Sequence, residues 1–209
     1  MFKKENITRE SKLAEHDSLS SYLGHAAQQN HYAYEAFYNL LNEVKPSRIL
    51  EIGTAMGGFT MFLKLTCNDL RLNIPILSYD IHGRQEHSTL IESGVDVRIE
   101  NVFNDNYSEV KQEIIDYIQQ DGTTLVLCDG GWKIGEFNLL SKFIKQGDII
   151  MAHDYASTTD YFNNHINLKF WNWLEIQDSD IQGAVSSNNL EPFMQEQFTQ
   201  AVWVCKIKK

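Results

Sequence analysis

Several residues that could bind a ligand stand directly after short apolar runs of the chain. Gly53 and Asp80 follow two such runs, Asp129 ends a third, and His153 with Asp154 ends a fourth. In an open parallel sheet, ligands bind beyond the carboxyl ends of the strands, which share one edge. If the four runs are neighbouring strands, these residues lie together. Their spacing therefore predicts one ligand site built from four strand ends.

The stretch Glu-Ile-Gly-Thr-Ala-Met-Gly-Gly, from Glu51 to Gly58, joins the first of these runs to a helical pattern. Small residues let a ligand approach the backbone, and the first N–H groups of a helix are free to bind it. Asp80 ends the next run, where its carboxylate could accept hydrogen bonds from both hydroxyls of a ribose. Dinucleotides and S-adenosylmethionine are both bound in this way. The structural alternative is a tight turn and a surface acid without a ligand.

Alternating apolar runs and amphipathic segments must position these residues. Strands are expected at 48–53, 76–81, 95–99, 123–128, 148–152 and 201–207, and helices at 57–66, 85–92, 107–120 and 134–145. The repeated order of strand then helix predicts an α/β fold, with a parallel sheet, helices on both faces and right-handed crossovers. The first forty-five residues are expected to be helical, because apolar residues from Tyr32 to Val44 recur at three- and four-residue spacing. We expect a single domain, 1–209, with a helical cap over 1–45, a cofactor-binding core over 46–155 and acceptor-side elements over 156–209.

The composition narrows the class of protein. The chain has 209 residues, 43% of them apolar, and a formal net charge of −10, which argues against a nucleic-acid partner. Three widely separated cysteines, Cys67, Cys128 and Cys205, favour a reducing compartment. The N-terminus lacks the apolar core of a signal peptide, and no apolar run reaches membrane-spanning length. A cytoplasmic protein without a membrane partner is expected, and a homo-oligomer is left open.

The glycine turn resembles the first motif of the class I methyltransferases, in which an acid, one residue and a glycine-rich turn follow one another. Alanine at position 55 replaces the usual middle glycine. The resemblance implies a Rossmann-like fold with a mostly parallel seven-stranded sheet and an N-terminal helical cap. It implies that Glu51 and Gly53 lie near the methionine part of S-adenosylmethionine, that Asp80 holds the ribose, and that residues 100–103 flank the adenine. The full set of implied cofactor-binding residues is Glu51, Gly53, Thr54, Ala55, Gly57, Asp80, Asn101, Val102 and Asp129.

The segments 127–133 and 145–155, together with 45–59 and with Glu136 and Phe137, sharpen this resemblance. They look like the corresponding segments of metal-dependent O-methyltransferases of the cephalosporin-hydroxylase, rhamnosyl and macrolide or sugar type. In those families, an acid after the fourth strand and an acidic pair after the fifth bind a magnesium-type ion. The resemblance implies Asp129 and Asp154 as ligands, with His153 in place of the second acid. This histidine leaves Mg²⁺, a softer divalent cation or no metal open.

Two side chains are candidates for the catalytic base. Catechol-type O-methyltransferases have Asp-His-Trp-Lys at this point, and the resemblance implies Lys133 as a base, although this chain has one extra glycine before Trp132. Lys133 would need burial or a nearby metal to lower its pKa, whereas the ordinary pKa of His153 lies near neutrality. The structural alternatives are a helix cap for Asp129, a solvated Lys133, and a hydrogen-bonded pair for His153 and Asp154.

The acceptor side of the site is expected after the fifth strand. Aromatic residues gather there, namely Tyr155, Tyr161, Phe162, Phe170, Trp171 and Trp173. Flat apolar walls would hold a sugar or an aromatic ring, and core packing or an oligomer interface is the alternative. Residues 28–31, before the long helix, are a candidate lid, because a glutamine-containing segment often lies there in the resembling families.

These features together predict an S-adenosylmethionine-dependent O-methyltransferase that acts on a small-molecule or sugar hydroxyl, assisted by Mg²⁺ or another divalent cation. The first rival is an NAD(P)-dependent oxidoreductase. Tyr107 and Lys111 have the spacing of a reductase pair, but they precede the fourth strand, the wrong place for that role. The second rival is a non-catalytic binding or partner subunit that retains the fold.

Overall fold

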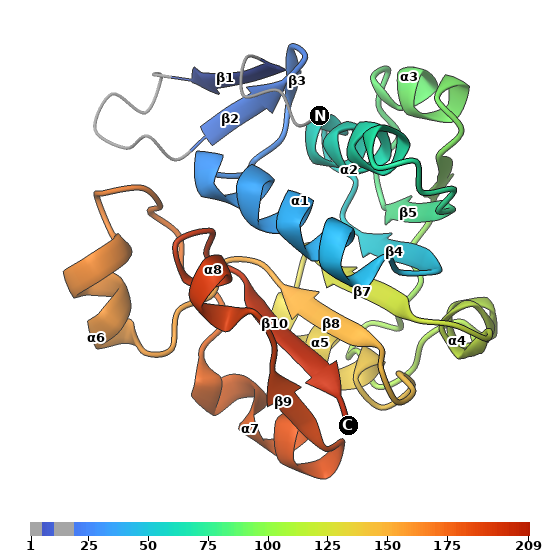
Figure 1. The fold of residues 1–209 in the computed structure, drawn as a ribbon. Coiled ribbons are helices and arrows are strands. Elements are labelled where there is room, and N and C mark those ends of the chain that lie inside the picture. The colour runs from blue at the N-terminus through green and yellow to red at the C-terminus, as the bar shows by residue number, and fades with distance from the viewer. Residues whose placement is uncertain (1–5, 11–18) are drawn as a thin grey trace.

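A seven-stranded sheet forms the centre of the molecule in the computed structural model, which describes residues 6–10 and 19–209 (Figure 1). Its strands are β4 (Arg48–Ile52), β5 (Ile76–Asp80), β6 (Asp96–Ile99), β7 (Thr124–Cys128), β8 (Ile149–Ala152), β9 (Leu190–Pro192) and β10 (Val204–Lys208). Their order is β6-β5-β4-β7-β8-β10-β9. The strands from β6 to β8 pair in parallel, and β10 runs antiparallel to both β8 and β9. The predicted α/β class and mostly parallel sheet are therefore confirmed.

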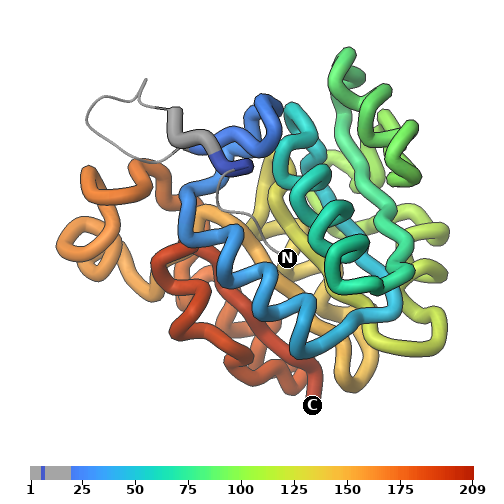
Figure 2. Tube along the Cα trace, turned by 45° about the horizontal axis from the view of Figure 1, so that its top comes forward, coloured from blue at the N-terminus to red at the C-terminus, as the bar shows by residue number. Residues whose placement is uncertain are grey.

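Helices cover both faces of this sheet. They are α1 (His31–Val44), α2 (Gly58–Asp69), α3 (His87–Glu92), α4 (Gln112–Gln119), α5 (Lys133–Leu140), α6 (Thr159–Tyr161), the π-helix η2 (Phe162–Ile166), α7 (Asp178–Ser187) and α8 (Gln195–Thr199). Leu125 and Leu127 of β7 pack in the core beneath α1, α2 and α8, whereas Val126 and Cys128 pack in the core beneath α4, α5 and α7. This alternation follows from the two-residue period of a strand. Figure 2 shows α1 and α2 side by side over the sheet.

The front of the chain differs from the expected helix over residues 1–45. A three-stranded antiparallel sheet, β1 (Ile7–Glu10), β2 (Leu19–Tyr22) and β3 (His25–Ala26), precedes α1. Gly24, with φ +85°, turns the chain between β2 and β3, and the Asn30 side chain caps α1 by accepting from the N–H of Tyr32. The helical prediction is wrong before His31, because the apolar spacing begins only there. Residues 1–5 and 11–18, which it also covered, lie outside the described residues.

The expected helix over 107–120 also begins later, at Gln112. The Asn104 side chain accepts hydrogen bonds from the N–H groups of Ser108 and Glu109, so this segment forms a turn instead. The helix expected over 134–145 runs from Lys133 only to Leu140. These differences move helix ends and leave the order of the elements unchanged.

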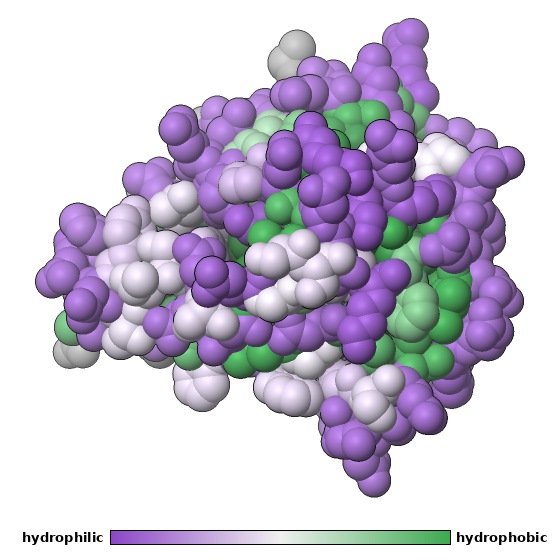
Figure 3. All heavy atoms as spheres, turned by 90° about the horizontal axis from the view of Figure 1, so that it is seen from below, coloured by the Kyte–Doolittle hydropathy of each residue, from purple (hydrophilic) through white to green (hydrophobic). Residues whose placement is uncertain are grey.

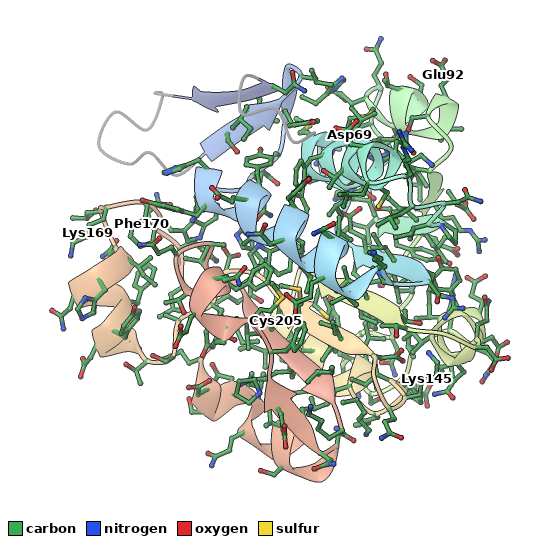
Figure 4. The ribbon with its side chains drawn as sticks, viewed as in Figure 1. Asp69, Glu92, Lys145, Lys169, Phe170 and Cys205 are labelled. Atoms are coloured by element: carbon green, nitrogen blue, oxygen red, sulfur yellow. The ribbon has the colours of Figure 1, made fainter. Side chains whose placement is uncertain are left out.

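The three cysteines are free and buried. Figure 4 shows Cys205 in the interior, on β10, and Lys145 near the margin of the molecule. On the face seen from below, polar residues cover most of the surface and apolar residues form patches between them (Figure 3). Among the described residues, no helix has both the length and the apolar character needed to span a membrane.

Candidate active site

Four adjacent strands bring the predicted site residues to one edge of the sheet. β5, β4, β7 and β8 are neighbours, and Asp80, Gly53, Asp129 and His153 stand at or just after their carboxyl ends. The backbone after β4 passes very close to the backbone after β7 here. Gly53 has φ +99°, and a Cβ at this position would overlap the carbonyl oxygen of Asp129. Only glycine fits the turn that connects β4 to the site.

An open cavity of about 210 Å³ lies along this edge. Its lining includes six of the nine residues predicted to bind the cofactor, Gly53, Ala55, Asp80, Asn101, Val102 and Asp129. The carboxylate of Asp80 is held there by two backbone donors, the N–H of Ala55 at 2.7 Å and the N–H of His82 at 2.8 Å. These bonds leave further lone pairs on both carboxylate oxygens, so Asp80 can still accept from a ligand.

Glu51, Thr54 and Gly57, the other three, are absent from this lining. Glu51 is buried and accepts hydrogen bonds from the hydroxyls of Thr60 and Ser78, and burial raises its pKa to about 7. Thr54 is also buried, with its hydroxyl 2.6 Å from that of Ser78. Gly57 is the left-handed N-cap of α2, with φ +77°. In the structure these three residues support the turn between β4 and α2, and their predicted contact with the cofactor stays a prediction.

Glu136 lines the cavity, and sequence reasoning missed it. Its carboxylate accepts from the N–H groups of Gly130 and Trp132, at 3.1 and 3.2 Å. Burial raises its pKa to about 7, although these two hydrogen bonds act in the opposite direction. A Cβ at Gly130 would overlap this carboxylate. Glu136 belongs to the residues that carry the resemblance, but the sequence pattern assigned it no role in the site.

Two aromatic rings lie beside the predicted adenine segment. Phe103 and Tyr107 line the cavity together with Asn101 and Val102. Their ring centroids are 4.8 Å apart with an interplanar angle of 27°, and Trp132 meets the Tyr107 ring edge-on. Flat rings of this kind suit a planar ligand.

Asp129, His153 and Asp154 form a cluster at the end of the cavity. One ligand atom from each lies within 4.8 Å of the others. Nδ1 of His153 is 3.1 Å from Oδ1 of Asp129 and 3.6 Å from Oδ1 of Asp154. Asp154 has a left-handed backbone, with φ +59°. A strained backbone at such a position is typical of functional sites. The alternative role of Asp129 as a helix cap is not realised, because Trp132 is the N-cap of α5.

Lys133 is surrounded by carboxylates. Its Nζ lies 3.0 Å from Asp154, 3.2 Å from Glu175 and 3.7 Å from Asp129. Burial acts to lower the pKa of Lys133, but the three carboxylates outweigh it and raise the pKa above the ordinary value. Lys133 is buried, so the solvated alternative is not realised. The raised pKa favours the charged ammonium and weighs against the lysine base, whose role stays a prediction.

Three more distant residues hold the cluster in place. The amide of Gln29 donates from Nε2 to Oδ2 of Asp129 at 2.8 Å, and its Oε1 accepts from the indole N–H of Trp203 at 2.8 Å. The indole N–H of Trp171 donates to Oδ1 of Asp154 at 2.8 Å. Gln29 therefore belongs to the site, within the segment 28–31 that was predicted as a lid.

The aromatic segment after β8 forms a cluster of its own. Phe162, Ile166 and Trp171 are buried together, next to Ala156 and Val202. Phe170, labelled in Figure 4, meets the ring of Tyr32 on α1 edge-on at 5.5 Å. Three of the six aromatic residues of this segment, Tyr155, Phe162 and Trp171, are buried, as the core-packing alternative to an acceptor wall expects. Tyr155 and Tyr161 line a separate cavity of about 190 Å³, and Trp173 is exposed.

A family model described as rhamnosyl O-methyltransferase/CmcI matches residues 16–171. Among solved structures, a CmcI structure described with Mg and SAM has a TM-score of 0.62 and 12% identity, and the match covers 90% of this chain and 76% of that one. A CmcI structure with SAH has a TM-score of 0.61 and 11% identity, over 90% and 82% of the two chains. A putative caffeoyl-CoA O-methyltransferase from Staphylococcus aureus has a TM-score of 0.53 and 11% identity, over 86% and 84%. No curated protein matches significantly.

Proposed function

The chain belongs to the rhamnosyl O-methyltransferase/CmcI family, and we propose that it transfers the methyl group of S-adenosylmethionine to a hydroxyl oxygen of a small molecule. A sugar or an aromatic hydroxyl is the acceptor class. The observation that carries this proposal is the position of Asp129, which both lines the cavity and belongs to the cluster with His153 and Asp154. One residue thus joins the cofactor cavity to the groups that would handle the acceptor.

The cavity suits the cofactor along its whole length. Asp80 offers carboxylate oxygens for the ribose hydroxyls, and Phe103 and Tyr107 offer rings beside the adenine position. Gly53 and Ala55 keep the backbone accessible to the methionine part. When bound, S-adenosylmethionine supplies an electrophilic methyl group. The chain then has to orient the acceptor oxygen in line with that group and exclude water, which is catalysis by positioning.

The cluster also suits a divalent cation. Asp129, Asp154 and Glu175 surround one ammonium, that of Lys133, and two negative charges among these four residues stay uncompensated. Asp129, His153 and Asp154 would hold the ion, which would lower the pKa of an acceptor hydroxyl. His153 serves as a base only where no metal occupies its Nδ1.

The positions of Tyr107 and Lys111 do not support the alternative function, an NAD(P)-dependent oxidoreductase. Lys111 is the N-cap of α4 and pairs with Glu100, whereas Tyr107 contacts Phe103 and Trp132. These two side chains therefore have separate partners. A non-catalytic binding subunit would also bind the cofactor. Only an assay of methyl transfer to an acceptor distinguishes it from the proposed enzyme.

Calorimetric titration with S-adenosylhomocysteine tests the cofactor class. We expect micromolar binding by the wild type and a loss of about 10- to 100-fold in Asp80→Ala, because ribose hydrogen bonds to a carboxylate are removed. Asp105→Ala, an exposed acid outside the cavity, is the matched control and should bind as the wild type does. Binding of NADH without S-adenosylhomocysteine would overturn the proposal. Transfer of labelled methyl groups to a panel of sugar and phenolic acceptors then separates an enzyme from a binding subunit.

A further inference from the structure

We propose that the site formed by Asp129, His153 and Asp154 selects a transition-metal ion that favours imidazole, such as Zn²⁺, over Mg²⁺. The inference rests on the proposed function only for the location of the metal beside the cofactor cavity. Its argument comes from the donor atoms of this chain. Imidazole nitrogen suits transition metals, whereas Mg²⁺ favours sites made of oxygen alone.

The imidazole takes a central position among the donors. Nδ1 of His153 lies near both carboxylates, at 3.1 Å from Oδ1 of Asp129 and 3.6 Å from Oδ1 of Asp154. An ion that used Oδ1 of both carboxylates would therefore meet this nitrogen as well. A cation that prefers oxygen would have to accept the nitrogen or use an incomplete set of protein ligands.

The His153 ring is held in this orientation by two indoles. It stacks on Trp203 with centroids 4.9 Å apart and an interplanar angle of 27°, and it lies 4.9 Å from the ring of Trp171. The residue is only 2% exposed. Because the ring is packed on both sides, it does not turn away to leave an oxygen-only site.

The surroundings of the two carboxylates point in the same direction. Gln29 donates to Oδ2 of Asp129, and Lys133 contacts Oδ2 of Asp154. Oδ1 of Asp154 also accepts from the indole N–H of Trp171, and Oδ1 of Asp129 lies 3.7 Å from Nζ of Lys133. These contacts orient both carboxylates so that Oδ1 of each approaches Nδ1 of His153. Such outer hydrogen bonds orient metal ligands and tune affinity. The Lys133 ammonium also weakens the field of the acids. That loss falls most heavily on Mg²⁺, whose binding relies on charge, and less on an ion that forms a strong bond to nitrogen.

Metal competition on the chelator-treated full-length protein tests this selectivity. Mn²⁺ binding is followed by electron paramagnetic resonance while Mg²⁺ is added, and Zn²⁺ affinity is measured by calorimetry. In the wild type we expect the affinity for Zn²⁺ to exceed the affinity for Mg²⁺, measured by displacement of Mn²⁺, by at least about tenfold, because imidazole suits Zn²⁺ and oxygen ligands suit Mg²⁺. His153→Asp should shift the preference toward Mg²⁺. His165→Asp makes the same chemical change at an exposed site and should leave the preference unchanged.

Pulsed paramagnetic resonance gives a direct readout that needs no variant. Bound Mn²⁺ should show nitrogen modulation from a coordinated imidazole in the wild type and in His165→Asp, and none in His153→Asp. Mn²⁺ bound without nitrogen coupling, equal affinities for Zn²⁺ and Mg²⁺, or no metal binding would each overturn the inference. S-adenosylhomocysteine binding is measured on the same samples. If the wild type does not bind S-adenosylhomocysteine, the result counts against the proposed function. If it binds S-adenosylhomocysteine but shows no preference over Mg²⁺, the result counts against this inference alone.

Discussion

Glu51 is a buried acid that connects three elements beneath the cavity. Its side chain is 2% exposed and accepts from the hydroxyls of Thr60, on α2, and Ser78, on β5. It thereby ties both elements to β4. The resemblance placed it at the cofactor, but the orientation of a side chain on a strand depends on which face is buried.

The raised pKa of Glu51 makes stability depend on pH. Burial raises the pKa from 4.5 to about 7 in the folded state, so folding favours the protonated acid. The stabilising contribution is complete below pH 4.5 and is lost as the pH rises toward and through 7. Glu51→Gln keeps an acceptor for both hydroxyls and removes the ionisation. Relative to the wild type, its free energy of unfolding should rise by about 2–3 kcal/mol between pH 4.5 and pH 8.

Chemical denaturation across this pH range measures the effect. The control is Glu92→Gln, an exposed acid labelled in Figure 4, which should follow the wild-type profile. A constant difference between Glu51→Gln and the wild type at every pH would show that Glu51 does not titrate in this window.

The connection between β4 and α2 is the element on which the cavity depends. Its first residue, Gly53, combines a left-handed backbone with close contact to the carbonyl of Asp129 after β7. The two neighbouring strand ends therefore approach each other only because position 53 lacks a side chain. This close packing holds the cavity lining next to Asp129, which belongs to the cluster with His153 and Asp154.

Gly53→Ala should destabilise the protein by about 3 kcal/mol or more, because the methyl group forces the strand ends apart and the backbone is strained. S-adenosylhomocysteine affinity should fall with it. Gly183→Ala is the matched control: a Cβ there meets nothing within 4 Å, and the position lies within α7. It should stabilise the protein by about 0.5–1 kcal/mol, since alanine is the better helix former. Equal thermal midpoints for the two variants would contradict this account of the turn.

At the scale of the whole molecule, the site joins distant parts of the chain. Gln29 stands before α1, Asp129 follows β7, and Trp203 precedes β10, yet they form one hydrogen-bonded series. Trp203 also packs against Phe37 and Phe59 in the core. The indole of Trp203, next to the last strand, thus orients the amide of Gln29. That amide in turn donates to Asp129, which follows β7 in the middle of the chain.

A double-mutant cycle measures this connection. Gln29→Met removes the amide, and Trp203→Phe keeps a ring but removes the N–H. Because both changes break the same hydrogen bond, their effects on unfolding should be non-additive by about 1 kcal/mol. The pair Gln29→Met with Tyr117→Phe, whose hydroxyl donates to the carbonyl of Ile49 instead, should be additive. Additivity in both pairs would mean that the front segment and the last strand are energetically independent, which would also count against the predicted single domain.

The sequence by itself determined six of the seven strands of the central sheet, their order in the chain and the residues at the ends of the parallel strands, and it missed β9. These features depend on local patterns, because apolar runs of strand length and the alternation of strand and helix leave few ways to bury both faces. Asp80, Asp129 and His153 were found for that reason. Their proximity followed from the shared edge of a parallel sheet and needed no knowledge of side-chain packing.

Only the tertiary structure decided what each of these side chains contacts. Lys133 has the spacing of a base, but its three carboxylate neighbours come from separate segments, including Glu175, which no local pattern links to it. The same holds for Gln29 and Trp203. A pKa and a hydrogen bond depend on distances of a few ångströms between segments far apart in the chain. The periodicity of the sequence does not report such distances. The order of the strands and helices of the core could therefore be predicted, whereas the electrostatics of the site could not.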